Sequence, residues 1–448
     1  MSHWTRSIFA GAALLGALLA GATNAHAQQL FGRESLLPAG TDLGEAGATE
    51  PREIFASEAH GGKQSFTVAL GNMLFSSADI FGEPARSAGI SCETCHAAGH
   101  ANLGLYVPGL SGPPGTFDVS NGFFHPIADD HVFNPVRIPS LRGVRFLAPY
   151  GRDGRIASLR DFTRNVIVGE FAGAEPDPLI LDALVSYMQE IEFLPNPRLQ
   201  SGGRLSTQAS DAERRGAALF QRAFAQMDGQ SCASCHIPNA AFVDHRQHDV
   251  GSGGLFKTPT LLGLLSRTPY FQDGRYATVD ETIAYFDRNF GLGLTDRDKA
   301  DLLAYLHAVG DSERPEQSIS VAAGLDEIET FAGTLDQLIR DRRHELLSVA
   351  VDTINHELRE LQEQFFAADL RPERGRIARI VIALRRVETA ALAGDDDHAT
   401  QQLGAVLDSL KAARRVLQAA EARALFNPKL REAYYEQLHR LQLATEGK

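Results

Sequence analysis

The C-terminal part of the chain has hydrophobic residues at helical spacing. From about Val321 onward, apolar side chains recur every three or four positions, which places them on one face of an α-helix. Residues 394–397 read Gly-Asp-Asp-Asp and predict a turn between two such helices. No motif with recognisable chemistry accompanies the pattern, so residues 320–448 are predicted to form a helical bundle that serves packing or docking. The apolar positions are Leu325, Ile328, Phe331, Leu335 and Leu338; Ile354, Leu358, Leu361 and Phe365; Ile377, Ile380, Leu384 and Val387; and Leu403, Leu407 and Leu410.

Shorter helices are predicted before residue 312. Asp177 and Pro178 supply an N-cap and a first-turn proline, and residues 295–298 resemble a capping box. Each signal precedes leucines at helical spacing. Stretches rich in Pro and Gly at 195–203, and again at 310–315, predict boundaries. We therefore predict a mainly α protein with domains at residues 28–200, 208–312 and 320–448.

The first residues have the pattern of a secretory signal peptide. Arg6 precedes an apolar run from residue 8 to residue 22, and Ala25-His26-Ala27 offers a cleavage site. We expect residues 1–27 to be removed and the mature chain to be periplasmic. No later stretch reaches the roughly 18–20 apolar residues of a membrane span, so no membrane span is predicted. The net charge of −13 argues against a nucleic-acid partner, because phosphate binding needs a basic surface.

The four cysteines form two Cys-x-x-Cys-His motifs, Cys92/Cys95/His96 and Cys232/Cys235/His236. Two thiols on one helical turn can add to the two vinyl groups of a porphyrin, while the adjacent imidazole reaches its iron. A thioredoxin-type pair does not need the histidine, and a shared zinc site would need the two motifs close together. The motifs therefore predict two covalently bound haems c, attached to the four cysteines, with His96 and His236 as proximal iron ligands.

The sequence around the motifs is duplicated. Residues 137–159 align without gaps onto residues 257–279, with nine identities in 23 positions at an offset of 120. Upstream, Gly71 and Phe75 match Gly216 and Phe220 on predicted helices that run toward each motif. The repeat predicts two tandem cytochrome c-type domains of the same fold.

With these motifs and the repeated Pro-Ser/Thr-Leu, Pro-Tyr and Asp-Gly-Arg segments, residues 53–312 resemble the bacterial di-haem cytochrome c peroxidase family, which includes the MauG proteins. The resemblance implies a periplasmic oxidoreductase that takes electrons from a small carrier, a cytochrome c or a copper protein. In this family the C-terminal haem relays electrons to an N-terminal haem that reacts with hydrogen peroxide. The helical tail lies outside the resemblance and is a candidate for protein–protein contact.

The chain departs from the family pattern at functional positions. Arg152 stands where members have a tryptophan between the haems, and Phe286 stands where they have the second haem's distal Met or Tyr. Ungapped counting places Ala172 at the position of the peroxidatic acid, so Glu170 is a catalytic candidate only if the loop is rebuilt. Arg137 replaces a calcium-binding Asn, so calcium is compatible with the resemblance but is not predicted. Two neighbouring positions also differ: Phe162 occupies a glutamine position, and Tyr285, adjacent to Phe286, would need a turn of about 100° to substitute for it.

Histidines and arginines in the loops after each motif are further candidates. His125, His131, His245 and His248 are candidate distal iron ligands, and His125 and His245 share the 120-residue offset of the repeat. Their alternative role is that of surface or propionate-binding histidines. Arg155 and Arg275 are candidates for binding haem propionates, or for pairing only within their own repeat segments.

Two functions remain open on the sequence alone. The first is a peroxidase-like oxidoreductase with one open or displaceable distal site. The second is a di-haem electron-transfer cytochrome without peroxidase activity, with both irons closed by histidine. In a third view, the helical tail makes the chain a partner-bound subunit of a larger complex.

Overall fold

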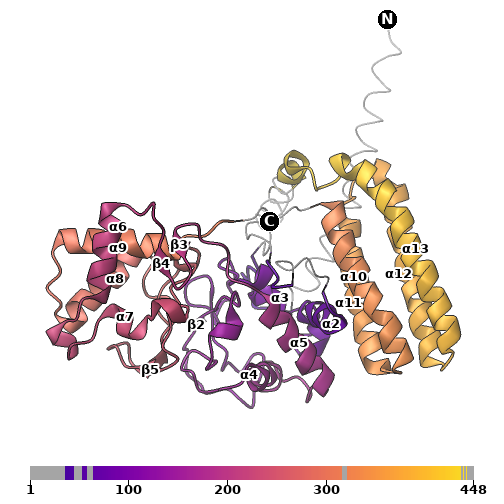
Figure 1. Ribbon diagram of the computed structural model, residues 1–448. Coiled ribbons are helices and arrows are strands. Elements are labelled where there is room, and N and C mark those ends of the chain that lie inside the picture. The colour runs from indigo at the N-terminus through magenta and orange to yellow at the C-terminus, as the bar shows by residue number, and fades with distance from the viewer. Residues whose placement is uncertain are drawn as a thin grey trace, which may run out of the picture.

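The computed structural model describes residues 36–44, 53–57, 64–314 and 320–434, together with residues 437 and 440. The predicted signal peptide lies outside the described residues. The architecture is mainly α, as predicted, with a cytochrome c-type domain in the middle, its duplicate at one end and a helical bundle at the other (Figure 1). None of the helices in the described ranges is long and apolar enough to cross a membrane.

The two cytochrome c-type domains share one plan: an entry helix, a single helical turn bearing the motif, a long loop, and two closing helices. The entry helix crosses the last helix in each domain at a glycine, Gly71 in the first and Gly216 in the second. A side chain on Gly71 would lie 2.0 Å from the carbonyl oxygen of Ala183, and one on Gly216 would lie 2.0 Å from that of Asp301. The matched glycines therefore allow the same close helix crossing twice. The helices are α2 (Phe66–Phe75), α3 (Cys92–Cys95), α4 (Leu159–Asn165) and α5 (Pro178–Glu190), then α6 (Asp211–Gln221), α7 (Cys232–Cys235), α8 (Val279–Phe290) and α9 (Asp296–Gly310).

Three short antiparallel ladders hold the loops of these domains. The first and third ladders close the long loop of each domain just before its repeated segment, and the second lies in the linker between the domains. The strands pair as β1 (Thr116–Phe117) with β2 (Val136–Arg137), β3 (Leu199–Gln200) with β4 (Arg204–Leu205), and β5 (Gln247–His248) with β6 (Phe256–Lys257).

Four long helices follow the second cytochrome domain and pack as a closed bundle. They are α10 (Val321–Arg340), α11 (His344–Glu363), α12 (Arg371–Leu392) and α13 (Asp396–Ala420). Each contacts the next along the chain, and α10 also contacts α13. The apolar stripes point inward as predicted: Leu325, Leu358 and Leu384, for example, have no exposed surface.

The hydrophobic cores do not follow the three predicted domains. One continuous cluster of buried residues joins the first cytochrome domain to the bundle, and α10 and α11 both contact α2. The second cytochrome domain has a separate, smaller cluster. Because removing this apolar surface from water is the main source of folding free energy, the first domain and the bundle form one packed body.

The seam between the two cytochrome domains has pseudo-twofold symmetry. The backbone N–H of Arg137 donates to the carbonyl oxygen of Gln272 at 2.9 Å, and the N–H of Lys257 donates to that of Arg152 at 3.2 Å. Arg137 and Lys257 are related by the 120-residue offset of the repeat, and so are Arg152 and Gln272. The duplicated segments therefore meet each other across the seam through equivalent bonds.

Candidate haem site

One continuous cavity of about 970 Å³ lies between the cytochrome domains. Its lining includes both cysteines and the histidine of each motif, so a single space serves both halves of the molecule. Its other walls come from the repeated segments and from α8 and α4 with the turn that follows α4. This size and largely apolar lining are typical of cofactor sites.

Each motif forms one helical turn that is capped in the same way. The backbone N–H of Ser91 donates to the Thr94 hydroxyl at 3.0 Å, and that of Ser231 donates to the Ser234 hydroxyl at 2.9 Å. Since Thr94 and Ser234 lie inside the two motifs, the variable positions of the Cys-x-x-Cys-His sequence fix the turn that presents the thiols.

A backbone carbonyl group holds each motif histidine in one orientation. The Nδ1 atom of His96 donates to the carbonyl oxygen of Pro139 at 3.0 Å, and that of His236 donates to Phe242 at 3.2 Å. In each ring this bond fixes the tautomer and leaves Nε2 with its lone pair. Burial lowers the pKa of His96 to about 4 and also lowers the pKa of His236, so both imidazoles are neutral.

The cysteines fit covalent haem attachment. All four thiols are free of disulfides and line the cavity. Burial raises the pKa of the Cys92 and Cys95 thiols to about 12, so these two are neutral. Paired neutral thiols, a neutral imidazole with a free Nε2 and an apolar cavity are the groups that a c-type haem requires at each motif.

The helix that follows each repeated segment carries the main chemical difference between the two halves. In the first half, Phe162, Val166 and Glu170 line the cavity. Positions offset by 120 residues, which are Thr282, Phe286 and Phe290, line it in the second half. The first half therefore places a carboxyl group where the second half places an aromatic ring.

Glu170 lines the cavity at the end of the turn that follows α4. After α4 the chain continues as a turn of π-helix over Val166–Glu170. A π-turn accommodates an extra residue and is frequent at functional sites. The catalytic role of Glu170 stays a prediction. Ala172, the residue given by ungapped counting, does not line the cavity and has a positive φ of 51°.

The surroundings of Glu170 suit proton transfer near neutral pH. Its side chain is 12% exposed, and its Oε1 atom lies 3.8 Å from Arg155 Nη2 and 3.4 Å from the Asn165 amide nitrogen. Burial raises the pKa of Glu170 to about 7, against the opposing effect of Arg155. A carboxyl group with this pKa can both accept and return a proton at physiological pH.

The distal region of the second half is aromatic. Phe286 lines the cavity and stacks on Phe290, with ring centroids 6.0 Å apart. The neighbouring Tyr285 does not line the cavity, because its hydroxyl donates to the carbonyl oxygen of Val250 at 2.7 Å. Neither residue at these positions of the helix therefore offers a ligand atom to an iron bound at His236.

Replacing Phe286 by methionine tests this geometry. A thioether at this position would face the iron bound by His236, and methionine ligation raises the reduction potential. We expect Phe286→Met to shift the reduction equilibrium of the second haem by about tenfold toward the reduced state, or 59 mV for one electron. Tyr285→Met is the matched control, because residue 285 does not line the cavity. Equal potentials in both variants and the wild type, measured by redox titration, would contradict the assignment.

The structure brings one of the four candidate distal histidines to the cavity. His248 lines it, whereas His125, His131 and His245 do not. The Nδ1 atom of His131 pairs with Asp129 at 3.1 Å. The Nδ1 atom of His125 accepts from the backbone N–H of Ala128, and that of His245 donates across the seam to the carbonyl oxygen of Ala148. The two histidines that share the 120-residue offset therefore have different partners, and only His245 contacts the other domain.

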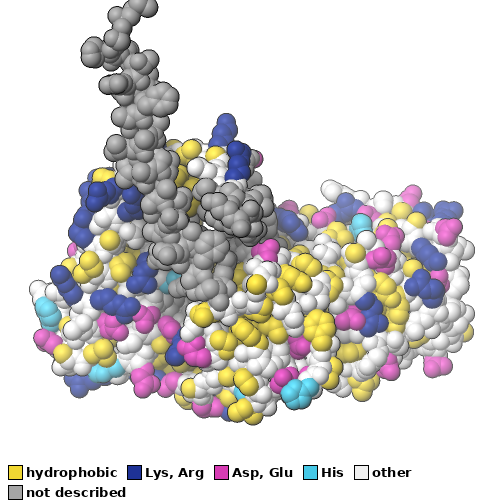
Figure 2. Space-filling model, turned by 180° about the vertical axis from the view of Figure 1, so that it is seen from behind, with side chains coloured by type: hydrophobic (Ala, Val, Ile, Leu, Met, Phe, Trp, Pro, Cys, Tyr) yellow, Lys and Arg dark blue, Asp and Glu magenta, His cyan; other side chains and the backbone are white. Residues whose placement is uncertain are grey.

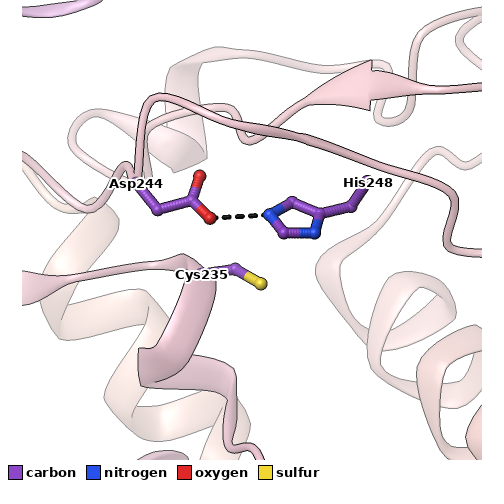
Figure 3. A group of neighbouring side chains, drawn as sticks. All are labelled: Cys235, Asp244 and His248. Carbon is purple, nitrogen blue, oxygen red and sulfur yellow. Dashed lines mark hydrogen bonds and ion pairs between the residues drawn. The ribbon is translucent and has the colours of Figure 1, made fainter.

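His248 lies beside a cysteine of the second motif. Its Nε2 atom is 2.6 Å from a carboxylate oxygen of Asp244, and the ligand atoms of Cys235, Asp244 and His248 all lie within 4.8 Å of one another (Figure 3). The imidazole is thus held next to the sulfur atom to which a haem vinyl group would be joined. Its ligation of the iron stays a prediction.

The two arginines suggested for the propionates are each paired within their own repeat segment. Arg155 lies 2.9 Å from Asp153 and also lines the cavity, whereas Arg275 lies 2.6 Å from Asp273 and does not line it. The cavity wall has other basic residues, which sequence reasoning either missed or named only as departures from the family pattern. These are Arg137, Lys257 and Arg267, together with Arg152, whose guanidinium lies 5.3 Å from the centre of the Phe256 ring.

Part of the second cytochrome domain matches a known protein family. Residues 212–301 match a family model described as di-haem cytochrome c peroxidase, which covers most of the second cytochrome domain and its motif. The resemblance inferred from the motifs is confirmed there, and the family is one of haem oxidoreductases.

Individual relatives are more distant. The chain is 24% identical over 199 residues to the hydrazine synthase subunit gamma of Kuenenia stuttgartiensis, covering 32% of this chain and 54% of that protein. The chain thus spans about half the length of this curated relative. A structure of Kuenenia stuttgartiensis hydrazine synthase is 22% identical, with a TM-score of 0.40, and covers 61% of this chain and 97% of its own. A MauG-like protein associated with microbial copper homeostasis is 17% identical, with a TM-score of 0.41, and covers 58% of this chain and 92% of its own.

Proposed function

We propose that the protein is a di-haem c-type oxidoreductase that reduces hydrogen peroxide at its first haem with electrons relayed by the second. The observation that carries the proposal is the asymmetry of the shared cavity. Glu170 lines the part formed by the first half, and Phe290 lines the part formed by the second. An acid near neutral pKa promotes cleavage of the O–O bond. Aromatic rings offer no such group and suit a haem that only passes electrons.

The residues of the first half would each have a defined task. Haem iron, when bound through His96, supplies the electron exchange with peroxide. The carboxylate of Glu170 accepts a proton from hydrogen peroxide and returns it to the departing hydroxyl oxygen, which leaves as water. Arg155 and Asn165 hold this carboxylate in place, and the rings of Phe162 and Phe171 line the same wall and exclude bulk water. Over the full reaction, two electrons and two protons convert one peroxide into two waters.

The electrons would come from a small redox carrier of the periplasm, a cytochrome c or a copper protein. The loop before the first repeated segment supports a docking face, because Asp130 and Asn134 line the cavity while Ile127, Val132 and Phe133 are 93%, 57% and 60% exposed. Figure 2 shows hydrophobic side chains gathered over the middle of the molecule, where the first cytochrome domain lies. Export of the chain rests on the signal pattern of residues 1–27.

A specific observation favours the alternative of a di-haem electron-transfer cytochrome without peroxidase activity. Arg152 stands at the position where the family has a tryptophan between the haems, and the single tryptophan of the sequence, Trp4, lies within the predicted signal peptide. A tryptophan is therefore not available to hold an oxidising equivalent between the haems of the mature chain.

Spectroscopy of the full-length holoprotein decides between the two functions. Electronic and EPR spectra of the oxidised and half-reduced protein, followed by peroxide addition, should show one haem with an open site that reacts with peroxide. If both haems remain six-coordinate and inert to peroxide, the peroxidase function fails and the electron-transfer function stands.

A further inference from the structure

Besides Arg152, whose guanidinium lies over the Phe256 ring, three basic side chains line the cavity at the seam without a carboxylate partner among the described residues. They are Arg137, Lys257 and Arg267, and none forms an ion pair with any residue in the described part of the chain. Arg267 is 7% exposed, and its Nε atom is buried without a hydrogen-bond partner. Burial lowers the pKa of Lys257 to about 8 and that of Arg267 to about 9, the latter also because Arg137 and Arg142 are close.

Two of these cations are equivalent by the repeat and reach across the seam in equivalent ways. Arg137 donates through Nη1 to the carbonyl oxygen of Arg267 at 3.5 Å. Lys257 donates through Nζ to the carbonyl oxygens of Leu147 and Pro149, both at 2.7 Å. Leu147 and Arg267 are themselves 120 residues apart. Each cytochrome domain therefore places one cation against the same segment of the other domain.

Carbonyl oxygens satisfy the donors of these side chains but do not balance their charges. A buried cation without an anion is strongly destabilising, and buried charges in proteins are usually paired. Of the acidic residues that line the cavity, Asp153 and Glu170 interact with Arg155, and Asp130, Asp228 and Asp249 form no ion pair with these three cations. The seam thus holds three cations that line the cavity and that no carboxylate among the described residues pairs.

We propose that Arg137, Lys257 and Arg267 form a carboxylate-binding site, called here the seam cations, which binds the propionates of both haems. Each haem carries two propionates, and guanidinium groups bind carboxylates with paired hydrogen bonds. The site differs from the arginines that the sequence suggested, because Arg155 and Arg275 are already paired with aspartates. This inference rests on the haem binding of the proposed function but does not depend on peroxide turnover.

The seam cations have an electrostatic consequence for both irons. Positive charge beside the propionates offsets their negative charge and so favours the ferrous state, which carries one positive charge less than the ferric state. Because Arg137 belongs to the first domain and Lys257 to the second, each domain would help to set the potential of the haem in the other.

Redox titration of the holoprotein tests the proposal. Arg137→Met and Lys257→Met should each shift the reduction equilibrium of at least one haem about tenfold toward the oxidised state, or 59 mV for one electron. Arg137→Lys keeps the charge and should restore most of the shift. Arg297→Met is the matched control, since this arginine on α9 has a 76% exposed side chain and lies outside the cavity lining. Potentials in the two variants that equal those of the wild type would overturn the proposal.

A measurement on the wild type keeps the test valid if a variant does not fold. The propionate bending vibrations in the resonance Raman spectrum should shift in deuterated water, because the protons bonded to the propionates belong to exchangeable guanidinium and ammonium groups. Propionate modes without an isotope shift would overturn the proposal. If the protein shows these shifts but does not turn over peroxide, the proposal of the seam cations stands and only the proposed peroxidase function fails.

Discussion

Replacement of Glu170 by glutamine is expected to lower the rate of peroxide reduction by about 10²–10⁴-fold, the usual contribution of a positioned acid–base group. Glutamine has nearly the same shape but cannot accept the proton of hydrogen peroxide. The spectrum of the first haem should change little, because Glu170 is not a proximal ligand. Stopped-flow mixing of the reduced protein with peroxide measures the effect.

The control for this variant is Glu175→Gln. Glu175 follows the π-helical turn but pairs with Arg164 on the surface, where its side chain is 60% exposed. We expect peroxide reduction at the wild-type rate in this variant. If the rate of Glu170→Gln lies within threefold of the wild-type rate, Glu170 does not act as the acid–base group.

The same carboxyl group predicts the pH dependence of the reaction. Because burial raises the pKa of Glu170 to about 7, its base form is scarce below that pH and predominates above it. The rate of the peroxide step should rise with pH through about 7 and then level off. In Glu170→Gln this rise should disappear, and the slow peroxide reaction that remains should not depend on pH in this range.

Removal of both thiols from the second motif is expected to halve the covalently bound haem. Cys232→Ala combined with Cys235→Ala leaves one of two attachment motifs, so the haem content of the denatured protein should fall from two per chain to one. If the second haem relays electrons, steady-state turnover with a reduced carrier should then be lost. A single peroxide reaction at the first haem should survive.

The matching pair of variants separates the two haems. Cys92→Ala with Cys95→Ala should also leave one haem, but it should abolish the peroxide reaction itself. The haem content of each variant is measured as its pyridine haemochrome after acid extraction of unattached haem. Peroxide reactivity that survives loss of the first motif, rather than the second, would reverse the assignment of roles.

The sequence was sufficient for the parts of the site that are local. A Cys-x-x-Cys-His motif specifies its own helical turn, and Thr94 and Ser234 within the motifs form the caps. The repeat also predicted the equivalence of the two domains, and at its offset Arg137 and Lys257, for example, both line the cavity. The amphipathic pattern of the tail placed its apolar residues inside the bundle for the same reason, since helical spacing alone decides it.

Features that depend on contacts distant in sequence were not predictable in this way. The π-helical turn over Val166–Glu170 departs from regular helix geometry, and no residue pattern in the sequence announced it. No sequence pattern marked Arg267 as buried, because the residues that contact it, such as Arg137, belong to the other domain. The sequence also did not predict the core that the bundle shares with the first domain. An apolar stripe shows that a helix has a buried face, but it does not show which other helix packs against that face.

The pseudo-twofold seam makes the two cytochrome domains comparable to a homodimer whose subunits have been fused into one chain. An interface between identical subunits binds every ligand twice and must keep both copies the same. Fusion removes that constraint while the paired backbone bonds of Arg137 and Lys257 keep the two halves in register. One half was thus free to acquire a carboxyl group at residue 170 and the other a phenyl ring at residue 290, without any change in how the halves meet.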